Sequence, residues 1–406
     1  MKTDNKQVSF KDITIELSDG LHAAPKFYPD GDYIFVNAKN IVNGKIVDVD
    51  PNKKTSYEEY LKYKIDLNEH TVLYSIDGTI GNVAKYRGEK VVLGKGACYL
   101  KLKPEADTDY IFFYLQSPKF WDYIRAMSTG STIKHISLKT MRNHTFCLPD
   151  ISTQRKIASV LSSLQKKTDI NEKINENLEQ QALALFRHYF MDFEPYGGVA
   201  PSNWTEVSLD DVCARITDGS HYSPADVPDA PYPMYSVKDM ETYGFNSSSC
   251  KHITAEEFLK MQKNDCVPRL NDILVAKDGS YLKEIFICSE EKDEAILSSI
   301  AIFRPNTEII MPEILLYLLK QPSVRKDVGD NYVSGSALPR IVLKDFKKYT
   351  FLLPPMEEQI KIGSVLHAIR MQTKANIDEI QSLSALRDTL LPRLMSGELD
   401  VSCLEL

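Results

Sequence analysis

The clearest pattern of apolar and polar positions along the chain is a 4,3 spacing that occurs twice, over residues 157–185 and 362–390. Apolar residues that recur every 3.5 positions on average form the seam of a coiled coil. Each stretch therefore predicts one long helix of roughly 30 to 35 residues. The predicted seam positions are Ile157, Leu161, Leu164, Thr168, Asn171, Leu178 and Leu185 in the first helix, and Ile362, Leu366, Ile369, Thr373, Asn376, Ile380, Leu383 and Leu390 in the second.

Polar residues interrupt the seam at the same two places in each helix. Thr168 and Asn171 correspond to Thr373 and Asn376. Polar seam residues that pair across the interface fix its register at some cost in stability; the alternative is a polar stretch at a solvated helix edge. Each helix has an apolar face that needs a partner helix, and the simplest partner is the other helix of the same chain. We therefore expect an intramolecular antiparallel coiled coil, about 45 to 50 Å long.

Before each helix the pattern changes to short β-like runs separated by turn residues. Residues 33–38, 71–78 and 272–279 are examples. Pro149 and Pro354 then precede the helical stretches. The predicted fold class is α+β, with two tandem mixed α/β domains that are each followed by a long helix. The expected boundaries are 1–150 for the first domain, 151–195 for the first helix, 196–354 for the second domain, and 355–406 for the second helix and C-terminal tail.

An internal repeat underlies this organisation. Residues 130–161 align without a gap to residues 335–366, at an offset of 205, and roughly half of the positions are identical. Upstream, Asp19-Gly20 corresponds to Asp218-Gly219 at an offset of 199, and Asp77-Gly78 to Asp278-Gly279 at 201. The chain is therefore a tandem duplication whose loops differ. One fold that reads two different targets would have this pattern, and so would a duplication that has merely drifted.

Composition and charge narrow the class of protein. A chain of 406 residues is longer than one core usually organises. Its seven cysteines are scattered without a C-x-x-C pair, so we expect reduced thiols and no zinc site. No apolar run approaches the ~18 residues of a membrane span, which favours a cytoplasmic protein without a membrane partner. The net charge of −7 is unlike that of most nucleic-acid binders, so DNA binding would need local positive charge.

Such local charge occurs in the repeated segment. Positive side chains beside hydroxyl groups are the combination that contacts phosphates and base edges, although a solvated basic strand edge would look similar. The candidates for DNA contact are Ser131, Thr132, Lys134, His135, Lys139 and Arg142 in the first copy, and Ser336, Arg340, Lys344 and Lys347 in the second.

Two further distinctions follow from the repeat. Lys139 and Lys344 recur at the same place, so we interpret them as contacts to phosphates that do not depend on the DNA sequence. Lys134 and His135 correspond to Pro339 and Arg340, and positions that differ between copies are candidates for reading bases. The Asp-Gly pairs are foremost turn formers. Lysines near these turns could also reach DNA: Lys85, Lys277 and Lys283.

Motifs of the common catalytic and cofactor sites are absent from the sequence. The sequence has no Walker loop, G-x-G-x-x-G turn, H-E-x-x-H pair, G-x-S-x-G elbow, or N-P-P-[FY] or D-P-P-[FY] tetrapeptide of amino-methyltransferases. We therefore expect no catalytic residue, cofactor site or metal site in this chain. The enzymatic alternative is a nuclease or methyltransferase whose motifs are not recognisable.

The repeated pattern GS…I…L…(F/Y)…LP…Q…KI…VL, followed by a helix with a seam, resembles the specificity subunit of type I restriction-modification systems. The resemblance covers nearly the whole chain, and both copies carry the pattern. Gln154 and Gln359 match the family's Leu-Pro…Gln signature, and we interpret them as structural residues near the helix starts. Asp150-Ile151-Ser152 departs from the usual stretch, which is present at Pro355-Met356-Glu357.

The resemblance implies a function and a set of partners. Each domain would be a target recognition domain that reads one half of a split, asymmetric site in double-stranded DNA. The helices would set the gap between the halves and bind two methyltransferase subunits, which hold S-adenosylmethionine, and motor-nuclease subunits would join for cleavage. This chain itself would be non-catalytic. The alternatives are a non-catalytic scaffold whose domains bind protein, and the DNA-recognition part of another restriction or methylation enzyme.

Overall fold

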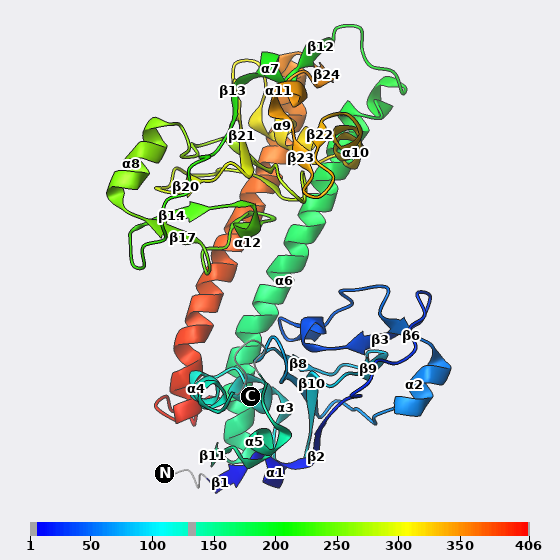
Figure 1. The fold of residues 1–406 in the computed structure, drawn as a ribbon, viewed down its shortest axis with the longest axis vertical. Coiled ribbons are helices and arrows are strands. Elements are labelled where there is room, and N and C mark those ends of the chain that lie inside the picture. The colour runs from blue at the N-terminus through cyan, green and yellow to red at the C-terminus, as the bar shows by residue number, and fades with distance from the viewer. Residues whose placement is uncertain (1–5, 129–134, 405–406) are drawn as a thin grey trace. The chain divides into compact units, whose positions relative to one another are not determined.

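The computed structural model describes residues 6–128 and 135–404 (Figure 1). The chain forms two compact units, of which unit 1 comprises Met1–Asn171 with Asp378–Leu406, and unit 2 comprises Glu172–Ile377. Each unit contains one α/β domain and one segment of each long helix. The predicted α+β class with two tandem domains and two long helices is confirmed.

The domain of unit 1 is built on a four-stranded antiparallel sheet of order β2-β10-β7-β8, and a smaller sheet, β6-β3-β9, has one parallel pair. Its elements are β1 (Lys6–Ser9), α1 (Phe10–Ile13), β2 (Thr14–Asp19), β3 (Tyr33–Val36), η1 (Ala38–Asn40), β4 (Ile41–Val42), β5 (Lys45–Ile46), β6 (Lys54–Thr55), α2 (Tyr57–Tyr63), β7 (Thr71–Ser75), β8 (Val83–Lys85), β9 (Val91–Leu93), β10 (Ala97–Leu102), α3 (Thr108–Tyr114), α4 (Pro118–Met127), α5 (Leu138–Asn143) and β11 (Thr145–Leu148).

The domain of unit 2 repeats this order, with a four-stranded sheet β13-β21-β18-β19 and a smaller sheet β17-β14-β20. Its elements are η2 (Glu194–Tyr196), β12 (Thr205–Ser208), α7 (Leu209–Val212), β13 (Cys213–Asp218), β14 (Tyr232–Tyr235), η3 (Val237–Asp239), β15 (Met240–Glu241), β16 (Gly244–Phe245), β17 (Lys251–Ile253), α8 (Ala255–Lys263), β18 (Ile273–Ala276), β19 (Ile285–Ile287), β20 (Ala295–Ile296), β21 (Ile300–Pro305), α9 (Pro312–Leu319), α10 (Pro322–Asn331), β22 (Val333–Ser334), β23 (Arg340–Ile341), α11 (Leu343–Phe346) and β24 (Thr350–Leu353).

The long helices are α6 (Ile151–Phe190) and α12 (Met356–Ser396), of 40 and 41 residues. Both are longer than the roughly 30 to 35 residues expected from the 4,3 pattern. The helices continue beyond the seam because their ends pack into domain cores. Phe186 and Phe190 of α6 join the core of unit 2, and Leu391 and Leu394 of α12 join the core of unit 1.

A buried glutamine fixes the start of each long helix to its own domain. The Gln154 side chain accepts from the Asp107 N–H at 2.8 Å and donates to the Pro149 carbonyl at 2.7 Å. Gln359 makes the same two bonds in unit 2, to Met311 and Pro354, each at 3.0 Å. The predicted structural role of these glutamines agrees with this geometry.

The first helix begins at Ile151 despite the unusual sequence before it. Asp150 accepts a hydrogen bond from the Thr153 N–H at 3.0 Å, which satisfies a donor in the first turn of the helix. The same hydrogen bonds, from the Thr153 backbone and hydroxyl, lower the pKa of the Asp150 carboxyl.

The predicted seam residues are all buried or half-buried. Within each unit the helix segments run antiparallel: Asn171 of α6 contacts Glu379 of α12 in unit 1, and Asn175 contacts Asn376 in unit 2. Asn171, Thr373 and Asn376 are at most 7 % exposed, so the alternative of a solvated polar edge is wrong for them.

The polar seam residues do not all pair as the repeat suggested. The Asn376 amide donates to the Asn175 side-chain oxygen at 2.7 Å, and the Asn171 amide donates to Glu379 at 2.7 Å. Both seam threonines instead donate to the carbonyl four residues earlier in their own helix. This option is open to any threonine within a helix, so these hydroxyls do not need a partner on the other helix.

We predict that Asn376→Ala lowers the free energy of unfolding by about 1 to 3 kcal/mol, because the buried Asn175 amide loses its partner. The double variant Asn175→Leu/Asn376→Leu should recover much of this loss, since both polar groups are then absent. Urea unfolding followed by circular dichroism measures both effects. Equal stability of Asn376→Ala and the unmodified protein would show that the pair contributes nothing.

Candidate DNA interface

The loops at one end of each four-stranded sheet form the candidate site. In unit 1 strands β2 and β7 end where β10 begins, because Asp19 pairs with Cys98 and Ser75 pairs with Ala97. The turns that follow β2 and β7 therefore lie beside the loop that precedes β10. We name this group the sheet-end loops; they comprise residues 19–22, 77–79, 94–96 and 135–136 in unit 1, and 218–221, 278–280, 297–299 and 339–341 in unit 2.

Glycines allow the sheet-end loops to approach one another. A Cβ atom on Gly20 would collide with the Leu93 carbonyl, and one on Gly219 would collide with the Ile296 carbonyl. Gly78 and Gly279 have φ angles of 72° and 71°, in the left-handed region that glycine enters without strain. The Asp-Gly pairs found in the sequence thus form real turns at corresponding places.

The predicted basic segment and the predicted Asp-Gly turns come together in both units. In unit 1 the Ile136 N–H donates to the Ile76 carbonyl at 2.9 Å, next to a bridge between Asp77 and His135. In unit 2 Asp278 forms the corresponding bridge with Arg340. Two features that were predicted separately are therefore one surface in each domain.

The predicted DNA contacts of unit 1 that the structure describes differ in exposure. Ser131, Thr132 and Lys134 lie outside the described residues. Lys139 is exposed on α5, and His135 is half-buried with its Nδ1 atom 4.0 Å from Asp77. Arg142 is half-buried and donates to the Leu17 carbonyl at 2.6 Å, so its guanidinium holds α5 to β2.

In unit 2, four of the six residues predicted to contact DNA are exposed. Arg340 is 55 % exposed, with its Nε atom 3.2 Å from Asp278. Ser336, Lys283 and Lys344 are also exposed. Lys347 is half-buried and lies 3.7 Å from Asp210.

Lys277 and Lys85 differ from their prediction as DNA contacts. The Lys277 ammonium is 5 % exposed and bonded to Asp218. Lys85 is bonded to Asp109, and its ammonium lies 5.2 Å from the centre of the Phe112 ring. Sequence proximity to a turn could not reveal these partners, because Asp218 and Asp109 reach the lysines only through the fold. The interface proposed below does not include either residue.

His144 also belongs to the core rather than to a basic surface. It is 5 % exposed and bonded to the Tyr114 hydroxyl at 2.8 Å. Burial, and secondarily the positive charge of Lys119, lower the pKa of the His144 imidazole to about 4. The imidazole is therefore neutral at pH 7.

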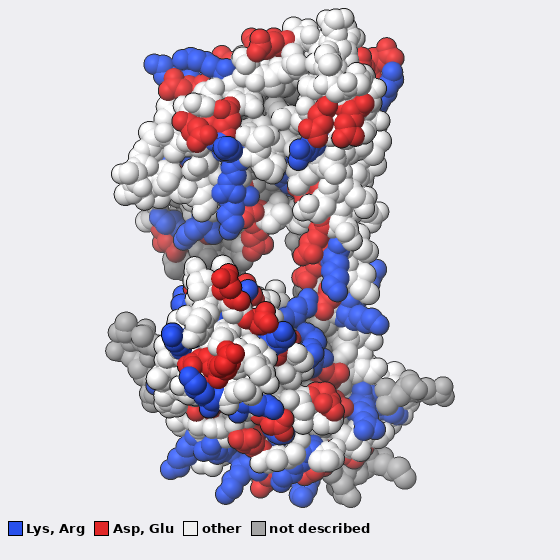
Figure 2. All heavy atoms as spheres, turned by 90° about the vertical axis from the view of Figure 1, so that its right-hand side faces the viewer, with Lys and Arg blue, Asp and Glu red and all other residues white. Residues whose placement is uncertain are grey.

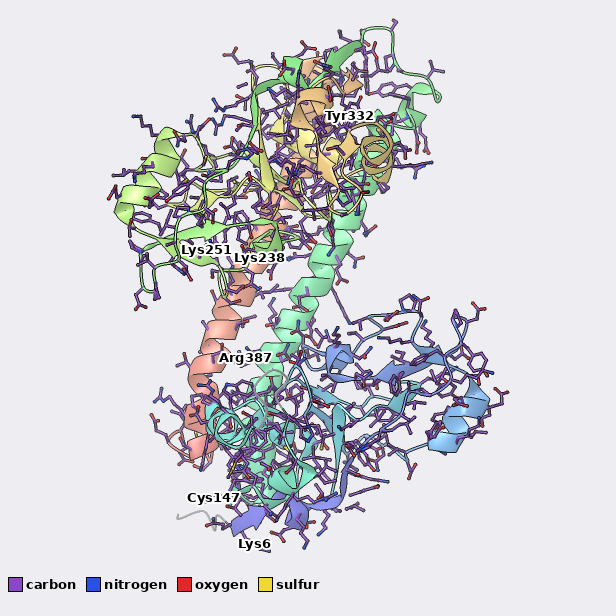
Figure 3. All side chains as sticks on the ribbon, viewed as in Figure 1. Lys6, Cys147, Lys238, Lys251, Tyr332 and Arg387 are labelled. Atoms are coloured by element: carbon purple, nitrogen blue, oxygen red, sulfur yellow. The ribbon has the colours of Figure 1, made fainter. Side chains whose placement is uncertain are left out.

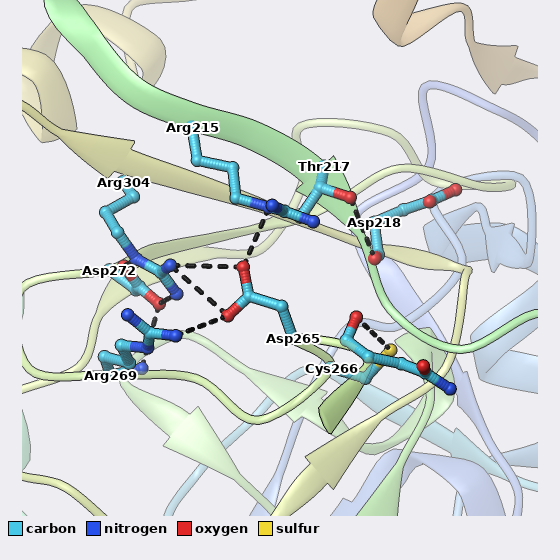
Figure 4. Close-up of polar contacts among 9 residues, drawn as sticks. Arg215, Thr217, Asp218, Asp265, Cys266, Arg269, Asp272 and Arg304 are labelled. Atoms are coloured by element: carbon cyan, nitrogen blue, oxygen red, sulfur yellow. Dashed lines mark hydrogen bonds and ion pairs between the residues drawn. The ribbon is translucent and has the colours of Figure 1, made fainter. Parts of the chain in front are cut away.

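Other arginines of unit 2 are engaged in a network of ion pairs (Figure 4). Asp265 lies 2.8 Å from Arg215 and 2.9 Å from Arg269, and Arg304 bridges Asp265 to the fully buried Asp272 at 2.8 Å. This network surrounds the start of β18, whereas the sheet-end loops follow its end. More generally, Figure 2 shows Lys and Arg mixed with Asp and Glu over the face that is drawn.

One further feature beside the sheet-end loops was not predicted from the sequence. Lys39 on η1 and Lys238 on η3 are both exposed and correspond at an offset of 199. The same offset relates Asp19 to Asp218. Applying it to the rest of the domain would have identified Lys39 and Lys238 as a shared pair.

The geometry thus defines a duplicated binding protein, in which two domains present similar loops with different side chains. Comparison with known proteins identifies the family. The family model described as "Type I restriction modification DNA specificity domain" matches residues 5–180 and 201–383. The chain therefore belongs to this family, and it is a specificity subunit with two such domains.

Named relatives cover almost the full chain at low identity. The type I restriction enzyme MjaIX specificity subunit of Methanocaldococcus jannaschii is 24% identical, over 93% of this chain and 89% of the relative. The HindI specificity subunit of Haemophilus influenzae is 23% identical, over 98% and 100%. A crystal structure of a type I system S subunit from M. genitalium has a TM-score of 0.57 at 17% identity, over 97% and 96%, and supports the fold.

Two observations concern classes of site outside the DNA interface. Over residues 6–128 and 135–404, no group of three or more His, Cys, Asp and Glu side chains is arranged to hold a metal ion. In the same part of the chain, no helix has both the length and the apolar character that crossing a membrane requires.

We predict that the low pKa of His144 makes the stability of unit 1 depend on pH. The folded pKa is below the usual value of 6.5, so the unfolded chain binds the proton more tightly. Stability should therefore be unaffected by this group above pH 6.5 and should fall as the pH drops toward 4. His144→Gln should reduce this slope in urea unfolding at pH 7, 5.5 and 4.5. His22→Gln, which changes an exposed imidazole, is the matched control, and equal slopes for all three proteins would contradict the prediction.

Proposed function

We propose that this chain is the non-catalytic DNA-recognition subunit of a type I restriction-modification complex, and that the sheet-end loops of each unit contact one half of a bipartite DNA site. The observation that carries the proposal is that the same loops are built twice with different exposed side chains. His135 stands in unit 1 where Arg340 stands in unit 2, each bridged to an aspartate turn. Recognition of two different half-sites by one fold requires a shared backbone framework whose loops carry different side chains.

Within these loops we assign two kinds of contact. Lys139 and Lys344 are exposed at corresponding positions and would contact phosphates. Arg340 would read a base, since a partly exposed guanidinium can exchange its contact with Asp278 for a bidentate contact with guanine. Ser336 and Lys283 are secondary candidates near the same surface, whereas Lys347 lies beside Asp210, which precedes the start of β13 and is at the other end of the sheet.

The partners are assigned by the same proposal. Two methyltransferase subunits would dock on the long helices and supply both S-adenosylmethionine and the chemistry, and motor-nuclease subunits would join for cleavage. Exposed apolar residues on α6 and α12 support docking of a protein there: Ile170, Ile174, Ile360, Val365, Met371 and Leu386. A methyltransferase that closes around DNA would also neutralise phosphates, which reconciles DNA binding with the net charge of −7.

The rival function is a scaffold whose two domains bind protein instead of DNA. The paired charges on the surface are compatible with either function. A competition assay distinguishes the two functions. The complex with its methyltransferase partner is bound to a duplex that carries the sequence methylated in the host, and scrambled duplex is added as competitor. Retention of the specific duplex supports recognition of DNA, and equal release of both duplexes would favour the scaffold.

We predict that the two domains read DNA independently. Replacing residues 6–148 by the corresponding domain of another specificity subunit should change one half of the methylated site, because the second set of sheet-end loops is unaltered. Methylome sequencing of a host that carries the exchanged protein measures this directly. The matched control replaces residues 205–353 and should change only the other half; a change of both halves by either exchange would refute independent reading.

We predict next that the helices determine the gap between the half-sites. Inserting four residues after Asn171 and four after Ile377 lengthens both helices by about 6 Å at the points where each passes from one unit to the other. The contacts inside each unit are kept. Since the rise per base pair is about 3.4 Å, the gap should grow by one or two base pairs.

A single insertion after Asn171 is the control for this prediction. It lengthens α6 alone, so the antiparallel register of the two helices cannot be kept, and the protein should lose stability in urea. An unchanged gap in a stable protein with both insertions would show that the helices do not set the spacing.

A further inference from the structure

We infer that Lys39 and Lys238 are a second pair of DNA phosphate contacts, one in each unit, at the sheet edge opposite to Lys139 and Lys344. The inference rests on the proposed function, because it names further residues by which the same surface holds DNA. The two lysines correspond by sequence, and each lies in a one-turn helix that follows the central strand of the smaller sheet.

The backbone around each lysine is held from the inside of the domain. In unit 1 the buried Asn40 side chain accepts from the Asn37 N–H at 3.0 Å. In unit 2 the buried Asp239 carboxylate accepts from the Ser236 N–H at 2.8 Å. The lysine that precedes each of these residues is exposed. A fixed backbone with an outward ammonium group loses little entropy when it binds a phosphate.

Both lysines are adjacent to the sheet-end loops. A Cβ atom on Gly96 would lie 3.6 Å from the Ala38 nitrogen and 3.7 Å from the Asp77 Cβ, so η1, the Asp-Gly turn and the loop before β10 converge. In unit 2 Ser299 makes the same connection: its hydroxyl accepts from the Val237 N–H, and its carbonyl accepts from the Lys277 N–H, each at 3.0 Å. Figure 3 labels Lys238 in unit 2.

The two kinds of shared lysine flank these loops from opposite sides. The β4–β5 hairpin that follows Lys39 packs on β8, one edge of the four-stranded sheet, and α5 with Lys139 packs on β2, the other edge. In unit 2 the hairpin contacts β19 through Phe245 and Phe286, whose ring centres are 5.1 Å apart. DNA held at both edges would be fixed over the loops between them, which carry the residues that differ.

Lys39 and Lys238 differ in charge pairing from two other cations near the loops. Arg340 faces Asp278 at 3.2 Å, and Lys277 is bonded to Asp218. In the part of the chain that the structure describes, no carboxylate lies within 4.0 Å of the ammonium group of Lys39 or Lys238. A phosphate contact would therefore displace only water, whereas a paired cation first has to give up its carboxylate. The alternative is that both lysines serve solubility alone.

The test is the salt dependence of DNA binding by the complete complex with its methyltransferase partner. Lys39→Gln, Lys238→Gln and the double variant are compared with the unmodified complex, on a duplex that carries its methylated site and on a scrambled duplex. Each lysine lost should reduce the slope of log K against log salt by about 0.9. The affinity gained between about 0.2 M and 0.05 M salt should then shrink by roughly threefold per lysine on both duplexes, and the methylated sequence should stay unchanged.

Three controls make the outcome specific. Lys6→Gln in unit 1 and Lys263→Gln in unit 2 remove exposed lysines on β1 and at the end of α8, outside the sheet-end loops, and should leave the slope unchanged. Lys39→Arg should keep the wild-type slope. All variants should have the same Tm, since no lost contact stabilises the fold.

An unchanged slope for the double variant would overturn the inference, and so would an effect confined to the methylated-site duplex, which would indicate base reading. Failure of the proposed function is distinguishable, because it would appear as an unmodified complex that binds both duplexes equally. The slope on the scrambled duplex still tests the two lysines in that case.

Discussion

The core of unit 1 is not complete without helix from a distant part of the chain. The core of unit 1 includes Leu391, Leu394 and Val401 from the end of α12 and the segment after it, packed with Ile157 and Leu161 of α6. Burial of each large apolar side chain stabilises by about 1.5 to 3 kcal/mol. The antiparallel pairing of the helices is therefore a condition for folding of unit 1, whereas unit 2 takes its helix segments from one continuous stretch, Glu172–Ile377.

The same constraint explains why polar groups are tolerated between the helices. The Asn376 amide donates to the buried Asn175 side-chain oxygen at one register, and a shift by one turn would take this donor away from Asn175. The position of α12 that corresponds to Asn175 in the repeat is Ile380, so Asn171 has no asparagine opposite it. It turns instead to Glu379, which also lies 3.3 Å from Lys167. The duplicated seam thus fixes its register by different bonds in its two halves.

Charge is distributed so that fold and recognition use different cations. Lys277, Lys85 and Arg142 stabilise the fold, because they bind Asp218, Asp109 and a backbone carbonyl, respectively. Other cations stay exposed, and Arg340, Lys139 and Lys344 are among those close to the sheet-end loops. An acidic chain can therefore still present positive groups where DNA would lie, because exposed cations remain beside the sheet-end loops.

The sequence by itself determined the features that depend on local pattern and on repetition. The 3.5-residue period marked both long helices, and the fixed offset of 205 marked two copies of one domain. The burial of the seam residues followed from the same period. Resemblance of the repeated motif to type I specificity subunits then gave the family. These signals survive in the sequence because helix periodicity and duplication need no knowledge of distant partners.

Only the tertiary structure decided which candidate residues are available. Lys277 and Lys283 look alike beside a turn, yet one ammonium is buried against Asp218 and the other is exposed, since contacts between strands far apart in sequence set burial. His144 reads as part of a basic segment but fills a core next to Tyr114. Lys39 and Lys238 gained meaning only when the fold placed η1 and η3 beside loops 40 to 60 residues further along the chain. Local pattern fixes elements, whereas the partner of each charge depends on how the elements pack.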